Sequence, residues 1–191
     1  MFLSINLKKL LIIGFLVEAL IFVCCYQMTD NWGEIFRLSA RYSGRLSLII
    51  YLICFFHFTF SFIKKKSSEK LKNSLIVFCF LHYIHFIFLA LSVYLNDLPI
   101  IPLKLTGGFI AYLMILIYPL MINMIKKMIY HFIFYYYVGI VFAATYLSRI
   151  QGNFEGANPE TFHFIGLGSI VASFILFTIL IMRFQEKLII N

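Results

Sequence analysis

Three histidines lie inside long apolar segments, His82 and His85 in one segment and His131 in another. Hydrocarbon is a poor environment for an imidazole, so a histidine kept within a membrane span usually has a partner there. Two imidazoles on separate helices can bind one haem iron from opposite sides. These histidines are therefore candidate axial ligands of a haem. Whether they can serve as such depends on the segments that position their rings.

The composition of the chain indicates an integral membrane protein. Of its 191 residues, 62% are hydrophobic, and they include 23 Phe and 12 Tyr. A soluble core does not need this much apolar surface, whereas a spanning helix takes ~20 mostly apolar residues. The pattern predicts an all-α bundle of six transmembrane helices, forming one domain over residues 1–191, with ordinary loops at Thr29–Gly44 and Ser148–Phe162. The six predicted spans are Leu10–Met28, Arg45–Phe62, Asn73–Tyr94, Leu105–Met124, Met128–Leu147 and His163–Met182.

Basic residues are distributed unevenly between the two sides of such a bundle. Cutting the chain at the six spans divides its 16 Lys and Arg into eleven on one side and five on the other. The first side holds Lys8, Lys9, Lys64, Lys65, Lys66, Lys70, Lys72, Lys126, Lys127, Arg183 and Lys187, and the second holds Arg37, Arg41, Arg45, Lys104 and Arg149. The positive-inside rule then places both termini in the cytoplasm of a multi-pass protein of the inner (plasma) membrane. The net charge of +8 indicates topology and contact with the lipid bilayer, not nucleic-acid binding.

Spacing from the basic flanks gives the depth of each histidine, because a helix rises ~1.5 Å per residue. On this measure His131 lies about 6 Å and His57 about 10 Å from the cytoplasmic edge. His82 lies about 15 Å and His85 about 20 Å from the same edge. His57, His82 and His131 therefore all fall in the cytoplasmic half of the bundle.

The spacing of His82 and His85 places both rings on one face of one helix. One helix does not easily bring two such rings to the same iron, so the second axial ligand is expected from another helix. His131 is the first choice for that ligand and His57 is the second. The alternative for each histidine is a hydrogen bond to a neighbouring helix, and that alternative stays open from the residues alone.

The order of motifs along the chain adds to this interpretation. It runs ARYSGRLS at 40–47, LHYIH at 81–85, LTGG at 105–108, His131, YYY at 135–137 and TYLSR at 145–149. Over about residues 38–150 this succession resembles the ferric-reductase-like transmembrane domain family, and especially its small bacterial stand-alone members. The resemblance implies a b-type haem held non-covalently by His82 or His85 and by His131. It also implies electron transfer across or within the bilayer, with the chain as the haem-bearing membrane subunit of an oxidoreductase.

Two departures from that family shape the prediction. A second histidine about thirteen residues after the first is common in the fifth helix of the family, but Ala144 and Thr145 occupy that neighbourhood here. One haem is therefore expected instead of two. The Arg that often follows the fifth-helix histidine is replaced by Phe132, and Lys126 and Lys127 are its candidate substitutes as partners of a haem propionate. Arg41 and Arg45, at the outer end of the second helix, are further candidates, with simple interface anchoring as the alternative.

The sequence contains no G-x-G-x-x-G motif and leaves no space for a Rossmann unit, so no flavin or nicotinamide site is expected. Electrons would come from a quinol or a separate reductase and pass to an unidentified acceptor. Two other functions stay open. One is a non-haem accessory or scaffold protein, and the other is a small transporter with Glu18 and the histidines as a proton relay. A buried carboxyl such as Glu18 can also serve only as a hydrogen-bond partner within the bundle.

Overall fold

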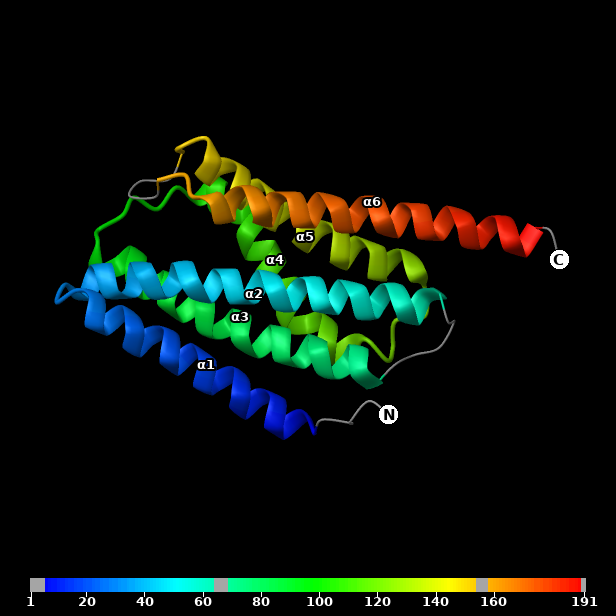
Figure 1. Cartoon of the computed structure of the whole chain (residues 1–191), viewed down its shortest axis with the longest axis horizontal. Coiled ribbons are helices and arrows are strands. Elements are labelled where there is room, and N and C mark those ends of the chain that lie inside the picture. The colour runs from blue at the N-terminus through cyan, green and yellow to red at the C-terminus, as the bar shows by residue number, and fades with distance from the viewer. Residues whose placement is uncertain (1–5, 64–68, 154–157, 190–191) are drawn as a thin grey trace. The chain divides into compact units, whose positions relative to one another are not determined.

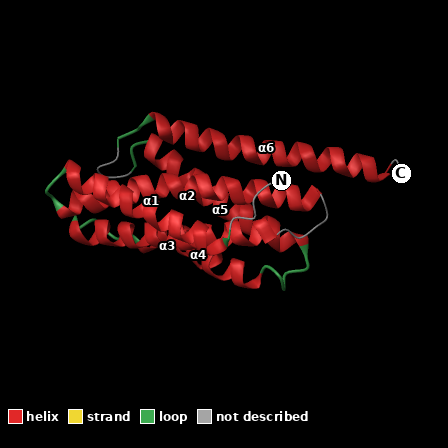
Figure 2. Ribbon diagram, turned by 60° about the horizontal axis from the view of Figure 1, so that its bottom comes forward, coloured by secondary structure: helices red, strands yellow, loops and turns green. Residues whose placement is uncertain are grey.

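The computed structural model describes residues 6–63, 69–153 and 158–189, and these ranges contain helices and no strand (Figures 1 and 2). The helices are α1 (Leu7–Met28), α2 (Trp32–Ile63), α3 (Glu69–Leu95), α4 (Pro102–Met121), α5 (Met128–Ile150) and α6 (Thr161–Ile189). All except α4 are long and apolar enough to cross a membrane, and α4 contributes the shorter apolar stretch Leu105–Met121. The prediction of an all-α, multi-pass membrane protein is therefore confirmed.

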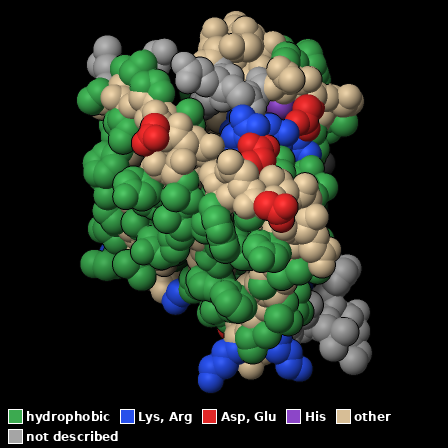
Figure 3. Space-filling model, turned by 90° about the vertical axis from the view of Figure 1, so that its left-hand side faces the viewer, with side chains coloured by type: hydrophobic (Ala, Val, Ile, Leu, Met, Phe, Trp, Pro, Cys, Tyr) green, Lys and Arg blue, Asp and Glu red, His purple; other side chains and the backbone are tan. Residues whose placement is uncertain are grey.

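The side of the membrane on which each terminus lies stays a prediction. The cluster Lys64, Lys65 and Lys66, which contributes to the predicted orientation, lies outside the described residues. The side chains of Lys104 and Lys187 also lie outside them. The hydrophobic surface that a membrane protein needs is plain in Figure 3, where apolar side chains cover most of the visible face and charged ones gather in a few places.

The segment Thr29–Gly44 is not the ordinary loop that the sequence predicted, because α2 begins at Trp32 and runs for 32 residues. Its first turns are amphipathic. Ile35, Ser39 and Ser43 follow one another at four-residue spacing and are all fully buried. The charged residues of this stretch lower its average hydropathy, so a search for uniformly apolar segments misses a helix with one buried face.

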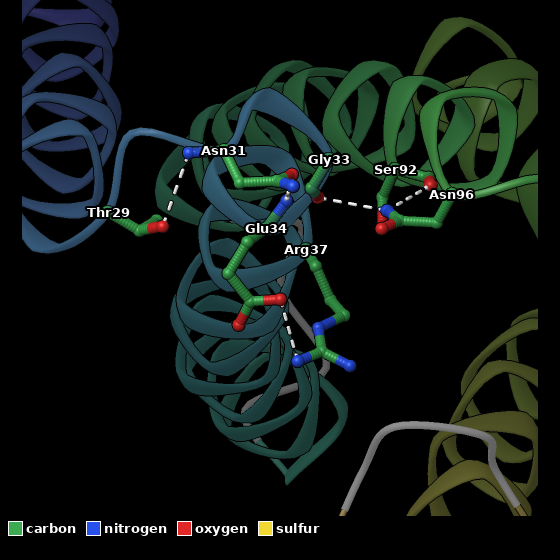
Figure 4. A network of polar contacts seen from close by, with 7 residues as sticks. All are labelled: Thr29, Asn31, Gly33, Glu34, Arg37, Ser92 and Asn96. Atoms are coloured by element: carbon green, nitrogen blue, oxygen red, sulfur yellow. Dashed lines mark hydrogen bonds and ion pairs between the residues drawn. The ribbon is translucent and has the colours of Figure 1, made fainter.

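A local hydrogen-bond network fixes the start of α2 (Figure 4). The backbone N–H of Glu34 donates to Asn31 Oδ1 at 3.0 Å, which is the usual contact of an N-cap residue. The N–H of Asn31 donates in turn to Thr29 Oγ1 at 3.3 Å. Glu34 also pairs with Arg37 at 2.6 Å, one turn further along the helix.

Asn96 connects this start to the end of α3. Its Nδ2 donates to the carbonyl oxygen of Gly33 at 2.9 Å and to that of Ser92 at 2.7 Å (Figure 4). A Cβ at Gly33 would lie 2.6 Å from Asn96 Oδ1, so a larger residue there would require the amide to shift. The two helix ends are therefore held by a contact that depends on one missing side chain.

The chain divides into two compact units, which are described separately. Unit 1 comprises Met1–Tyr51 and Lys72–Thr106, and unit 2 comprises Leu52–Leu71 and Gly107–Asn191. The expectation of one domain over residues 1–191 stays a prediction. In unit 1, α1 buries only a narrow stripe formed by Gly14, Glu18 and Cys25, and the rest of its surface is largely apolar and exposed. Such a helix suits contact with lipid on most of its sides.

Unit 2 is held together mainly by aromatic rings. Phe58 of α2 stacks on Tyr135 of α5, with ring centroids 4.4 Å apart. Phe55 and Phe177 meet edge to face at 5.3 Å, which joins α2 to α6. Aromatic pairs of this kind stabilise a core beyond the burial of their surface.

We predict that Gly33→Ala destabilises the protein. The added Cβ displaces the Asn96 amide, and losing that hydrogen bond should lower the free energy of unfolding by about 1–2 kcal/mol. Gly168→Ala in α6 is the matched control, because a Cβ there meets no described atom within 4 Å. Unfolding in detergent micelles measures both variants. Equal stability of the two variants would contradict the role assigned to the Gly33–Asn96 contact.

Candidate functional site

The two histidines of α3 lie next to each other inside unit 1. His82 is 6% exposed and His85 is half-buried. Their ring centroids are 5.4 Å apart, with 40° between the ring planes. The sequence prediction that these rings share a helix face is confirmed. The α3 helix thus presents a pair of imidazoles within a long apolar span.

Gly44 of α2 lies directly against His85. A Cβ at this position would be 3.0 Å from His85 Cε1 and 3.5 Å from each ring nitrogen. The missing side chain therefore lets the imidazole pack onto the α2 backbone. Sequence reasoning included Gly44 only as one letter of a motif and missed this contact. The predicted span began only at Arg45, so Gly44 fell in the predicted loop and gave no signal of a close approach between helices.

Glu18 of α1 is buried beside the same part of α2. The hydroxyl of Ser43 donates to Glu18 Oε1 at 2.8 Å, and the serine and the glutamate are 0% and 1% exposed. Ser43 directly precedes Gly44, so this bond lies next to the His85 contact in the α2 sequence. Ser39 and Ser47, one turn away on either side, are also fully buried. Unit 1 therefore contains a stripe of buried serines on α2, of which Ser43 is hydrogen-bonded to the Glu18 carboxyl.

The hydrogen bond within the bundle, one of the two interpretations of Glu18, is present in the structure. The second carboxyl oxygen, Oε2, is buried and has no hydrogen-bond partner among the described residues. A role of Glu18 as a proton relay stays a prediction.

His131, at the start of α5 in unit 2, has both ring nitrogens engaged. Nδ1 is hydrogen-bonded to the hydroxyl of Tyr118, and Nε2 lies 3.2 Å from the carbonyl oxygen of Ile125. A carbonyl only accepts, so Nε2 carries the proton and Nδ1 accepts from Tyr118. Sequence reasoning did not identify either partner, because both come from the neighbouring helix and loop.

The remaining predicted site residues, His57 and Arg45, have separate surroundings, and His163, which was not predicted to belong to the site, serves a structural role. His57 is half-buried in the part of α2 that belongs to unit 2. The guanidinium of Arg45 lies 5.0 Å from the ring centre of Tyr42, which is a cation–π contact within α2. His163 accepts a hydrogen bond from the Glu160 N–H at 3.0 Å and so stabilises the start of α6.

The side chains of the described residues can be tested for their ability to bind a metal ion or a haem. Within the described ranges no group of three or more His, Cys, Asp or Glu side chains is placed to hold a metal ion. A haem needs only two axial imidazoles, since the porphyrin supplies the other iron ligands. His82 and His85 belong to unit 1 and His131 belongs to unit 2. Ligation by His131 together with a histidine of α3 therefore stays a prediction.

Comparisons with protein-family models, curated proteins and solved structures found no match to this chain. The resemblance to the ferric-reductase-like family stays a hypothesis that rests on the order of its motifs.

We predict that Ser43→Ala lowers the free energy of unfolding by about 1–3 kcal/mol, because it leaves the buried Glu18 carboxyl without its partner. Ser173→Ala is the matched control, since the Ser173 hydroxyl donates only to the Ser169 carbonyl of its own helix. The control should stay within about 0.5 kcal/mol of the parent protein. Glu18→Gln keeps an acceptor for Ser43 and should retain most of the stability. An equal loss in Ser43→Ala and Ser173→Ala would contradict the importance of the Glu18–Ser43 bond.

Proposed function

We propose that this protein holds one b-type haem non-covalently and passes electrons within or across the cell's inner (plasma) membrane. The observation that supports the proposal most is the pair of adjacent imidazoles on α3, one buried and the other packed on Gly44. Histidines inside membrane spans are rare, and ionisable residues there often mark functional sites. Axial ligation of an iron is a use that suits neutral imidazoles in hydrocarbon.

In this proposal His131, together with His82 or His85, would hold the haem. If His131 held the haem through Nε2, it would give up the hydrogen bond to the Ile125 carbonyl. The bond between His131 Nδ1 and Tyr118 is compatible with ligation, provided that Nδ1 then carries the proton and donates to the hydroxyl. Hydrogen bonds of this kind orient a ligating imidazole and make it a stronger ligand. Tyr118 is thus a positioning residue for His131.

The haem, when bound, supplies one-electron exchange between ferric and ferrous iron. The protein's own contribution is to fix the two rings and to exclude water around them. Arg45 is the candidate partner of a propionate, because a guanidinium binds carboxylates well. The proposed electron donor is a quinol or a separate reductase, and the acceptor is unidentified.

A second candidate function is proton-coupled transport, which the surroundings of Glu18 favour. Its carboxyl lies in a helix that is long and apolar enough to cross the membrane, and one of its oxygens is hydrogen-bonded to Ser43. Ionisable groups at such depth often mark proton or ion pathways. This function does not require a haem, so the two proposals differ in whether the purified protein absorbs visible light.

The absorption spectrum of protein purified from haem-replete cells tests the first proposal. We expect a Soret band, with sharp α and β bands after dithionite reduction. His131→Ala, and at least one of His82→Ala and His85→Ala, should abolish these bands, whereas His163→Ala should keep them as a matched histidine control. Colourless parent protein, or full spectra in all three ligand variants, would overturn the haem assignment.

Tyr118→Phe tests the positioning role separately. It removes the hydrogen bond to His131 and should lower haem affinity about 10-fold to 100-fold without changing the type of spectrum. Tyr137→Phe is the matched control, because Tyr137 also joins α5 to α4, through a hydrogen bond of 3.1 Å to the Gly107 carbonyl. Titration of the apoprotein with haem measures both affinities. Unchanged affinity in Tyr118→Phe would show that Tyr118 does not position the ligand.

A further inference from the structure

Unit 2 has a cavity of about 600 Å³ between α4, α5 and the loop that joins them. Leu113, Met114 and Ile117 line it from α4, and Ile133 and Phe134 line it from α5. The volume lies within the range of pockets that bind small molecules. Ile117 and Ile133 are each 49% exposed, so the cavity is a groove that opens on the surface of the described chain.

The inner wall of this groove is flat and apolar. Tyr118 and Phe134 both line the groove, and their rings stack with centroids 3.8 Å apart and 6° between the planes. The Tyr118 hydroxyl is hydrogen-bonded to His131, so it has less hydrogen-bonding capacity left for a bound molecule. Met114, Met121 and Met124 add unbranched, flexible side chains that adapt to an irregular partner. Most of an occupant's length must therefore be hydrocarbon.

One end of the groove is cationic. Lys126 and Lys127 line it there, and both side chains are exposed. The α5 helix begins at the next residue, Met128, and no side chain caps its first turn. The positive end of that helix adds to the field of the two lysines. No acidic side chain is among the described residues that line the groove.

We propose that this groove binds an anionic phospholipid of the bilayer, with the phosphate at Lys126 and Lys127 and an acyl chain along α4 and α5. Charge complementarity selects the headgroup, since each basic side chain near an anionic headgroup adds to the attraction. The apolar walls of the groove favour binding of the lipid's acyl chain. A soluble anion leaves those walls unfilled, and a zwitterionic lipid brings no net charge to the lysines.

Quenching of a tryptophan by brominated lipids tests this directly in the full-length protein. Trp32 is the only tryptophan, so Trp32→Phe gives a silent background. Ile117→Trp then reports on the groove, and Ile175→Trp reports on an exposed position of α6 outside it. Each protein is reconstituted into vesicles that contain brominated phosphatidylglycerol or brominated phosphatidylcholine, and the relative binding of the two lipids is measured.

The groove reporter should prefer phosphatidylglycerol by about fivefold for each lysine, and the α6 reporter should show no such preference. Lys126→Gln with Lys127→Gln should abolish the preference. Lys8→Gln with Lys9→Gln, another adjacent pair close to the start of a helix, should leave it unchanged.

Three outcomes would overturn the proposal. The first is equal preference at both reporters, and the second is a preference that survives the loss of Lys126 and Lys127. The third is a groove reporter that neither lipid quenches, because a protein segment or a second copy then covers the groove. Native mass spectrometry of the chain without reporters gives an independent measurement. It should retain bound phosphatidylglycerol, and the Lys126→Gln/Lys127→Gln variant should lose it.

Discussion

The structure depends on one constraint, which is that a polar group inside a membrane helix must find its partner within the protein. Hydrocarbon offers no hydrogen bonds, so such a group bonds either to its own helix, as Ser173 does, or to a neighbouring helix. The carboxyl of Glu18 meets Ser43 and thereby joins α1 to α2. The imidazole of His131 meets Tyr118 and so joins α5 to α4. These contacts add specific polar pairings to helix surfaces that are otherwise mostly apolar.

Glycines allow the helices of unit 1 to approach one another closely. Gly14 lies against Leu81, since a Cβ added to this glycine would lie 3.0 Å from Leu81 Cδ2, and Gly44 lies against His85. Leu81 directly precedes His82 in α3, so α1 and α2 both pack against the turn of α3 that carries the two imidazoles. Small residues at membrane-helix interfaces commonly serve this purpose. A ligand ring held this way loses little freedom when it binds a metal, which favours the proposed use.

The sequence was enough to predict the helices and the relation of residues within one helix. Hydropathy located the spans, and the helical period placed His82 and His85 on one face. Hydropathy missed the helix over Trp32–Gly44, where half-buried charged residues such as Arg37 and Arg41 lower the average although Ser39 and Ser43 are fully buried. The sequence also could not supply the partners of His131, because a period fixes positions around one helix and not the rotation of that helix against its neighbours. The Gly44–His85 contact and the α4–α5 groove depend on that rotation as well.

The central claim is that two imidazoles of this chain bind one haem iron. Low-temperature electron paramagnetic resonance of the purified, oxidised protein tests it most directly. We expect a low-spin ferric signal of the bis-imidazole type, at one haem per chain. Protein that gives no ferric haem signal, or a signal from iron with a single imidazole ligand, would contradict the claim.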